Sequence, residues 1–212
     1  MESSSIEYAL LAMQRALLGE VTSTLRAVFV DLDKGQNIFF AGFYYDGEAS
    51  EQRVDLWNCA VTEASAALGQ FFEKSWIKRL DYPEPIPMQG YLAYLRKEGR
   101  ELDCFKGTPP CVVMREPTIG YALVAVQQSL LGMVSPELRS VVVDLEQSPL
   151  KLYIRFYYDG EISRELHQCW QFAQEKAQTY FGFGCLLDVG IERIDYPQKV
   201  PFRGRYAYFR KE

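Results

Sequence analysis

A repeat covers almost all of this 212-residue chain and constrains its fold more than any other feature. The hexapeptide FYYDGE stands at 43–48 and again at 156–161. At the same offset of 113 residues, IEYALLAMQRALLGEVTSTLRAVFVDLD matches IGYALVAVQQSLLGMVSPELRSVVVDLE. One inserted residue later, RLDYP matches RIDYP, and GYLAYLRKE matches GRYAYFRKE. A pattern that recurs in this way indicates a tandem duplication, in which both copies fold into the same unit.

The repeat divides the chain into three parts. The first copy occupies residues 1–98, a linker 99–116 and the second copy 117–212. Each copy has about 95 residues, which is near the usual size of a small domain. Adjacent prolines make the linker semi-rigid. The chain has five irregularly spaced cysteines, a pattern that favours reduced thiols. Cys104 and Cys111 flank the prolines of the linker, and the alternative is a disulfide or a metal site there.

Each copy predicts the same order of elements. Apolar residues with helical spacing fill 5–18 and 118–131, which Gly19 and Gly132 end. Next come two strands rich in β-branched or aromatic residues. A second helix follows after an Asp-Gly turn, and two further strands complete the copy. This order becomes ferredoxin-like when the last strand is moved to the front. We therefore expect an α+β fold of two tandem αββαββ units, each a permuted ferredoxin-like two-layer sandwich, arranged as a pseudo-dimer.

In this fold the last strand would pair with the strand before it through a proline-bearing loop. Alternation along the second strand predicts one face toward the helices in both copies. The inward residues are Phe39, Ala41, Phe43 and Tyr45, with Leu152, Ile154, Phe156 and Tyr158 as counterparts. The outward residues differ: Ile38, Phe40, Gly42 and Tyr44 are apolar, whereas Lys151, Tyr153, Arg155 and Tyr157 form a basic-aromatic stripe.

Residues suited to catalysis are scarce. The single histidine, His167, has Val54 as its counterpart, and the cysteines lack a matched histidine base. No GxGxxG, P-loop or HExxH motif occurs. We therefore predict no catalytic residue, no metal ligand and no cofactor. We interpret two repeated pairs as structural ion pairs: Arg79 with Asp81, and Arg193 with Asp195. We interpret FYYDGE as a strand end, a turn and a helix start.

The charge is distributed unevenly between the copies. Residues 1–98 hold 14 acidic and 9 basic side chains, whereas 117–212 hold 11 of each. An acidic protein is a poor general ligand of nucleic acid and suits a basic partner. The chain contains no apolar run of about 20 residues that could span a bilayer, and its start does not resemble a secretory signal. We therefore expect a cytoplasmic protein.

Three segments together resemble a group of bacterial immunity proteins encoded beside polymorphic toxins, of the Maf and contact-dependent inhibition type. They are RALLGEVTSTLRAVFV, FYYDGEAS and RLDYPEPIPMQGYLAYLRKE. The resemblance implies a non-enzymatic protein that binds and neutralises the C-terminal domain of a cognate secreted toxin, an EndoU-like RNase being the expected activity. Such relatives are single units that act as dimers, so a monomer of this chain would be equivalent to one dimer.

The excess negative charge of the first copy indicates where a basic toxin would bind, with aromatic anchors beside it. The candidate residues are Asp31, Asp33, Tyr44, Tyr45, Asp46, Glu48, Glu51 and Asp55. Two alternatives remain at this point. The stripe Lys151, Tyr153, Arg155 and Tyr157 could stack and hold single-stranded RNA. A small-molecule enzyme or sensor with a site between the copies is the other.

Overall fold

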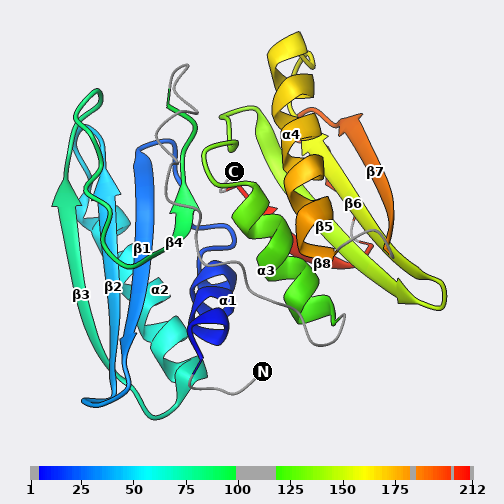
Figure 1. The fold of residues 1–212 in the computed structure, drawn as a ribbon. Helices are drawn as coiled ribbons and strands as arrows, with labels where there is room; N and C mark the ends of the chain where they lie inside the picture. Colours follow the sequence, from blue (N-terminus) through cyan, green and yellow to red (C-terminus); the bar gives the residue numbers. More distant parts are fainter. Residues whose placement is uncertain (1–4, 99–117, 182–184, 202, 211–212) are drawn as a thin grey trace. The chain divides into compact units, whose positions relative to one another are not determined.

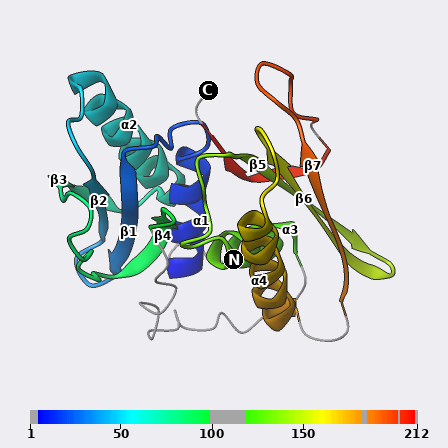
Figure 2. The ribbon, with the colours of Figure 1, turned by 90° about the horizontal axis from the view of Figure 1, so that it is seen from above.

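The chain forms two compact units of the same architecture in a computed structural model (Figures 1 and 2). The structure describes residues 5–98, 118–181, 185–201 and 203–210. The first range forms one unit and the other three form the second. The predicted linker 99–116, with Cys104 and Cys111, lies outside the described residues, so its boundaries stay a prediction.

Both units contain the αββαββ order that the sequence predicts. The first consists of α1 (Ile6–Ala16), β1 (Leu25–Asp33), β2 (Ile38–Tyr45), α2 (Glu51–Leu68), β3 (Phe72–Arg79) and β4 (Tyr91–Leu95). The second consists of α3 (Ile119–Ser129), β5 (Leu138–Gln147), β6 (Leu150–Tyr158), α4 (Arg164–Phe181), β7 (Leu186–Arg193) and β8 (Arg205–Phe209). Gly19 and Gly132 have positive φ angles beyond the first helix of each unit, as expected for helix ends. The α+β class and the tandem order are confirmed.

The strand pairing differs from the prediction. The sheets have the orders β3-β2-β1-β4 and β7-β6-β5-β8, so the last two strands of each unit lie at opposite edges. A permuted ferredoxin would place these two strands side by side, and that part of the prediction is wrong. The crossover through the 18-residue helix α2 places β3 parallel to β2 and directly beside it, whereas the ferredoxin-like order leaves one strand between them. The remaining edge is that of β1, where β4 pairs antiparallel.

The helices of each unit cover one face of its sheet. In the first unit α1 packs on β1 and β4, α2 packs on β2 and β3, and the helices contact each other. Phe39 and Phe43 of β2 are fully buried there, and the ring of Phe43 stacks on Trp57 of α2 with centroids 6.1 Å apart. Burying such a side chain stabilises the fold by about 1.5–3 kcal/mol. The predicted inward face of the second strand is therefore confirmed.

Candidate protein-binding site

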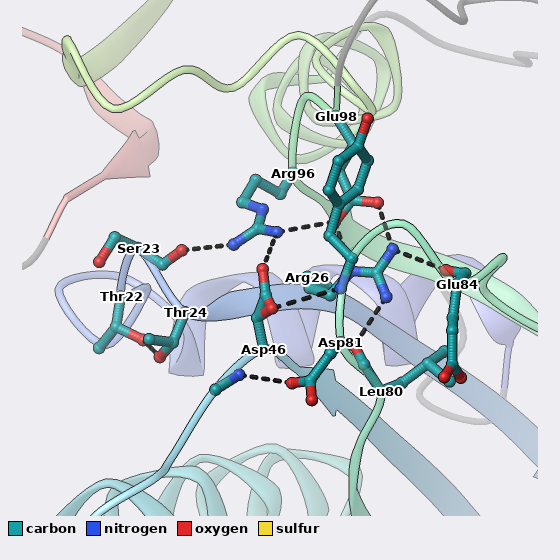
Figure 3. A network of polar contacts seen from close by, with 12 residues as sticks. Thr22, Ser23, Thr24, Arg26, Asp46, Leu80, Asp81, Glu84, Arg96 and Glu98 are labelled. Atoms are coloured by element: carbon teal, nitrogen blue, oxygen red, sulfur yellow. Dashed lines mark hydrogen bonds and ion pairs between the residues drawn. The ribbon is translucent and has the colours of Figure 1, made fainter.

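Arg26 of β1 fastens the loop between β3 and β4 to the end of the first sheet (Figure 3). Its side chain is only 1% exposed. The guanidinium donates to the carbonyl oxygens of Leu80 (2.7 Å) and Glu84 (2.9 Å), and it pairs with the carboxylate of Glu98. The repeated LR, RLDYP and RKE motifs thus supply the parts of one polar network.

The FYYDGE motif contributes Asp46 and Gly47 to the same polar network. Arg96 pairs with Asp46, and the backbone N–H of Gly47 donates to the carboxylate of Asp81 at 2.7 Å. The Arg79 guanidinium, followed by this N–H group, lowers the pKa of Asp81. Gly47 has a φ angle of 66°, a conformation that glycine adopts without steric cost. The Arg79–Asp81 ion pair is confirmed. FYYDGE forms a strand end and a turn as predicted, but the helix α2 begins only at Glu51.

The second unit repeats this network. Arg139 is 1% exposed and donates to the carbonyl oxygens of Ile194 (2.7 Å) and Gln198 (2.9 Å). The N–H group of Gly160 donates to Asp195 at 2.7 Å, as the equivalent group does in the first unit. The sequence shared by the two copies therefore maintains the fold. Differences in function are to be sought where the copies diverge.

One divergence is an exchange of large and small residues on the outer face. Gly42 of β2 is paired with Trp76 of β3, whereas Arg155 of β6 is paired with Gly190 of β7. A Cβ atom added at Gly42 would lie 2.0 Å from the Trp76 ring, and one added at Gly190 would lie 3.0 Å from Cδ of Arg155. Each unit therefore has one large side chain lying over a glycine, but from opposite strands.

The exchange gives the two outer faces different chemistry. In the first unit, the Trp76 ring lies 4.8 Å from that of Tyr44. In the second, Asp188 of β7 accepts from Lys151 (2.8 Å) and Arg155 (2.7 Å), and these two cations lower the pKa of Asp188. The basic charges of the predicted stripe are thus paired within the unit. This arrangement does not favour the RNA-binding alternative, because phosphate attraction requires available positive charge.

The structure does not bring the eight candidate toxin-binding residues to one surface. Tyr44 is only 3% exposed, and Tyr45 packs against Trp57 with ring centroids 5.4 Å apart. Asp31 and Asp33 lie at the opposite end of β1 from the polar network, where Asp33 accepts from backbone N–H groups of the following turn. Asp46 belongs to the network. Sequence alternation alone could not reveal that the outward-facing Tyr44 is covered.

The three remaining candidates, Glu48, Glu51 and Asp55, are exposed at the start of α2. Carboxylates there are also favourable for the helix itself, because they complement its positive N-terminus. At the equivalent positions of the second unit, Arg164 replaces Glu51 and Gln168 replaces Asp55. We call Glu48, Glu51 and Asp55 the α2 acidic surface. Glu51 and Asp55 of this surface distinguish the first unit from the second, whereas Glu48 is repeated as Glu161.

Other sites are not found in the described residues. No group of three or more His, Cys, Asp or Glu side chains there could hold a metal ion. Cys59 is exposed and Cys185 is buried, and both are free thiols. Among the helices that the structure describes, none is both long and apolar enough to cross a membrane.

Comparison with known protein families gives a match in both repeats. Residues 7–98 and residues 121–212 each match the model of one family, described as MafI2 immunity protein. The two matches correspond to the two units of the structure, confirm the predicted resemblance and tandem duplication, and fit the prediction of a pseudo-dimer. No curated protein matches the chain significantly.

Proposed function

Because the chain belongs to the MafI2 immunity protein family, we propose that it binds and neutralises a cognate toxin. The observation that carries this proposal is the family match in both repeats. Family membership supports a binding role in place of a catalytic one. We further propose that the partner is the basic C-terminal domain of a secreted toxin, acting in the cytoplasm as an EndoU-like RNase, and that binding involves neither nucleic acid nor membrane.

The α2 acidic surface supports the first unit as the part that meets this toxin. An RNase engages phosphates and so tends to carry a basic surface. Exposed carboxylates on an inhibitor accelerate the diffusional encounter with such a surface. Glu51 and Asp55 have no acidic counterparts in the second unit, where Arg164 and Gln168 stand instead. The two units would therefore contribute differently to one complex.

Purification of the tagged protein from its native bacterium tests the proposed function. We expect mass spectrometry to identify a stoichiometric, basic toxin fragment in the purified complex. The fragment should arrest growth when it is expressed alone in the cytoplasm, and coexpression of this chain should restore growth. Growth arrest that persists despite coexpression of the two soluble proteins would contradict neutralisation. If the RNA extracted from the arrested cells were intact, this result would contradict the RNase proposal but not the proposal of neutralisation.

Reversing the α2 acidic surface should slow toxin binding. The triple variant Glu48→Lys, Glu51→Lys and Asp55→Lys is expected to lower the association rate constant by about tenfold or more, because steered association depends on complementary charge. The dissociation rate should change less. Stopped-flow association with the purified toxin domain, repeated at increasing salt, measures both the rate and its salt dependence, which should become flatter.

A matched control changes the same amount of charge on the second unit. The variant Glu137→Lys, Glu161→Lys and Glu175→Lys alters three exposed carboxylates there. It should lower the rate much less than the α2 variant does. Equal effects of the two variants would mean that net charge alone steers binding, and the assignment to the α2 acidic surface would then be rejected.

A further inference from the structure

The strands β3 and β7 occupy equivalent edges of the two sheets. Phe72 and Leu80 donate their N–H groups to carbonyl oxygens next to and within β2, so the even-numbered residues of β3 bond inward. The odd-numbered residues then direct their N–H and C=O groups away from the sheet. The N–H group of Ile194 donates to the carbonyl oxygen of Tyr158, so in β7 too the even-numbered residues bond toward the neighbouring strand and the odd-numbered residues bond away from it. Both edges can therefore accept another strand.

Each edge strand begins with a large apolar side chain in solvent. Phe72 is 76% exposed and Leu186 is 57% exposed, and the two residues occupy equivalent positions in the repeats. Such a residue on an open edge favours pairing with a further strand. The surrounding side chains have diverged: β3 carries Lys74 and Lys78 on its outer face, and β7 carries acidic residues at the corresponding positions.

We propose that β3 of one copy of this chain pairs antiparallel with β7 of a second copy. The register that places Trp76 opposite Gly190 gives three pairs of opposite charge, while Arg79 lies opposite Leu187. It sets Glu73 against Arg193, Lys74 against Glu192, and Lys78 against Asp188. It also sets Phe72 against Ile194, Ile77 against Val189, and Leu80 against Leu186. Both exposed apolar residues thereby gain an apolar partner, and odd-numbered residues exchange the ladder hydrogen bonds.

Other pairings of the same strands are less complementary. A shift by two residues in either direction leaves no pair of opposite charges. The equivalent register between two β3 strands sets Lys74 against Lys78, which offsets its Glu73–Arg79 pair. The register between two β7 strands sets Asp188 against Glu192. Like charges directly opposite each other are destabilising. In the favoured register, residues whose side chains face the helices of one unit lie opposite residues whose side chains face the helices of the other. The helices of both units would therefore lie on the same face of an eight-stranded sheet. The pairing of unlike edges is therefore the selective one.

The pair of Lys74 and Glu192 is the most suitable for a test, because the other two pairs include a residue that already has an ion-pair partner. Asp188 already binds Lys151 and Arg155, and Arg193 already binds Asp195. By contrast, neither Lys74 nor Glu192 takes part in an ion pair within the part of the chain that the structure describes. Lys74 is exposed, and its described ring contact is a cation–π contact with Phe40, 5.9 Å from the ring centroid, so a charge change there disturbs little packing.

Sedimentation velocity at increasing protein concentration tests the proposal. We expect the average mass of the wild-type chain to rise above the monomer mass of 24.4 kDa. Lys74→Glu should weaken this association by about tenfold, because an attractive cross-strand pair becomes repulsive. The double variant Lys74→Glu with Glu192→Lys restores opposite charges and should recover most of the association. Lys34→Glu, an equal charge change at an exposed turn residue, should have little effect.

A proline on the open edge gives an independent test. Ser75 directs its N–H group outward, so Ser75→Pro removes a donor to the second copy without removing a bond to β2. This variant should abolish association and keep the far-ultraviolet circular dichroism of the wild type. The proposal is overturned if the wild-type chain stays monomeric at all concentrations. It is equally overturned if the double charge variant associates no better than Lys74→Glu alone.

Discussion

Arg26→Ala should lower the free energy of unfolding of the first unit by about 3–5 kcal/mol, because it leaves the partly buried Glu98 carboxylate with Arg96 as its remaining ion-pair partner and two loop carbonyl oxygens without their donor. The guanidinium is 1% exposed and holds both Glu98 and two carbonyl oxygens of the β3–β4 loop. Alanine can replace none of these bonds. Urea unfolding followed by hydrogen exchange of peptides from the first unit measures the loss, since a two-unit chain need not unfold in one step.

The exposed pair of the same network supplies the control. Arg79 and Asp81 are each about half exposed, so Arg79→Ala should change the free energy of unfolding far less than Arg26→Ala does. Arg139→Ala should reproduce the large loss in the second unit, because Arg139 is equally buried and holds the equivalent loop. If Arg26→Ala cost as little as Arg79→Ala, the buried arginine would not be what fastens the loop.

The sequence contained much of the local structure. The glycines after the first helices, the Asp-Gly turn and the alternation of β2 each depend on neighbouring residues, and all were predicted correctly. The start of β3 carries no such signal, because Glu73, Lys74 and Ser75 are exposed and lack an apolar alternation. Strand order depends on which edges are free, which neighbouring residues do not determine. The second helix indicates that the strands it joins are parallel, but it does not indicate that they lie side by side.

The candidate site was less predictable than the fold. Counting charges shows that the first copy is the more acidic one, but the counts could not show that Asp46 pairs with Arg96 or that Tyr44 is covered. Those facts depend on side chains distant in sequence. The pairing of Asp188 with Lys151 and Arg155 was missed for the same reason. It could be recognised only once β7 was placed beside β6, which the predicted strand order did not do.

Gly42→Ala should destabilise the first unit by about 1–3 kcal/mol, because the added methyl group overlaps the Trp76 ring. The predicted Cβ position is 2.0 Å from that ring, and no positive φ angle at Gly42 adds backbone strain. Gly190→Ala is the matched control, since its methyl group meets the flexible Arg155 side chain at 3.0 Å. That change should cost less than about 1 kcal/mol. Urea unfolding, with each unit followed by hydrogen exchange, provides the comparison.

A double-mutant cycle separates overlap with Trp76 from any general intolerance of β2. In the Trp76→Ala background, Gly42→Ala should be neutral or slightly stabilising, because the ring is gone and alanine suits a strand better than glycine does. The coupling between the two positions should then equal or slightly exceed the original loss. An equal cost of Gly42→Ala in both backgrounds would show that Trp76 does not cover Gly42. A large coupling would instead explain why the copies exchanged both residues together: neither Arg155 nor Trp76 fits its face unless the neighbouring strand supplies a glycine.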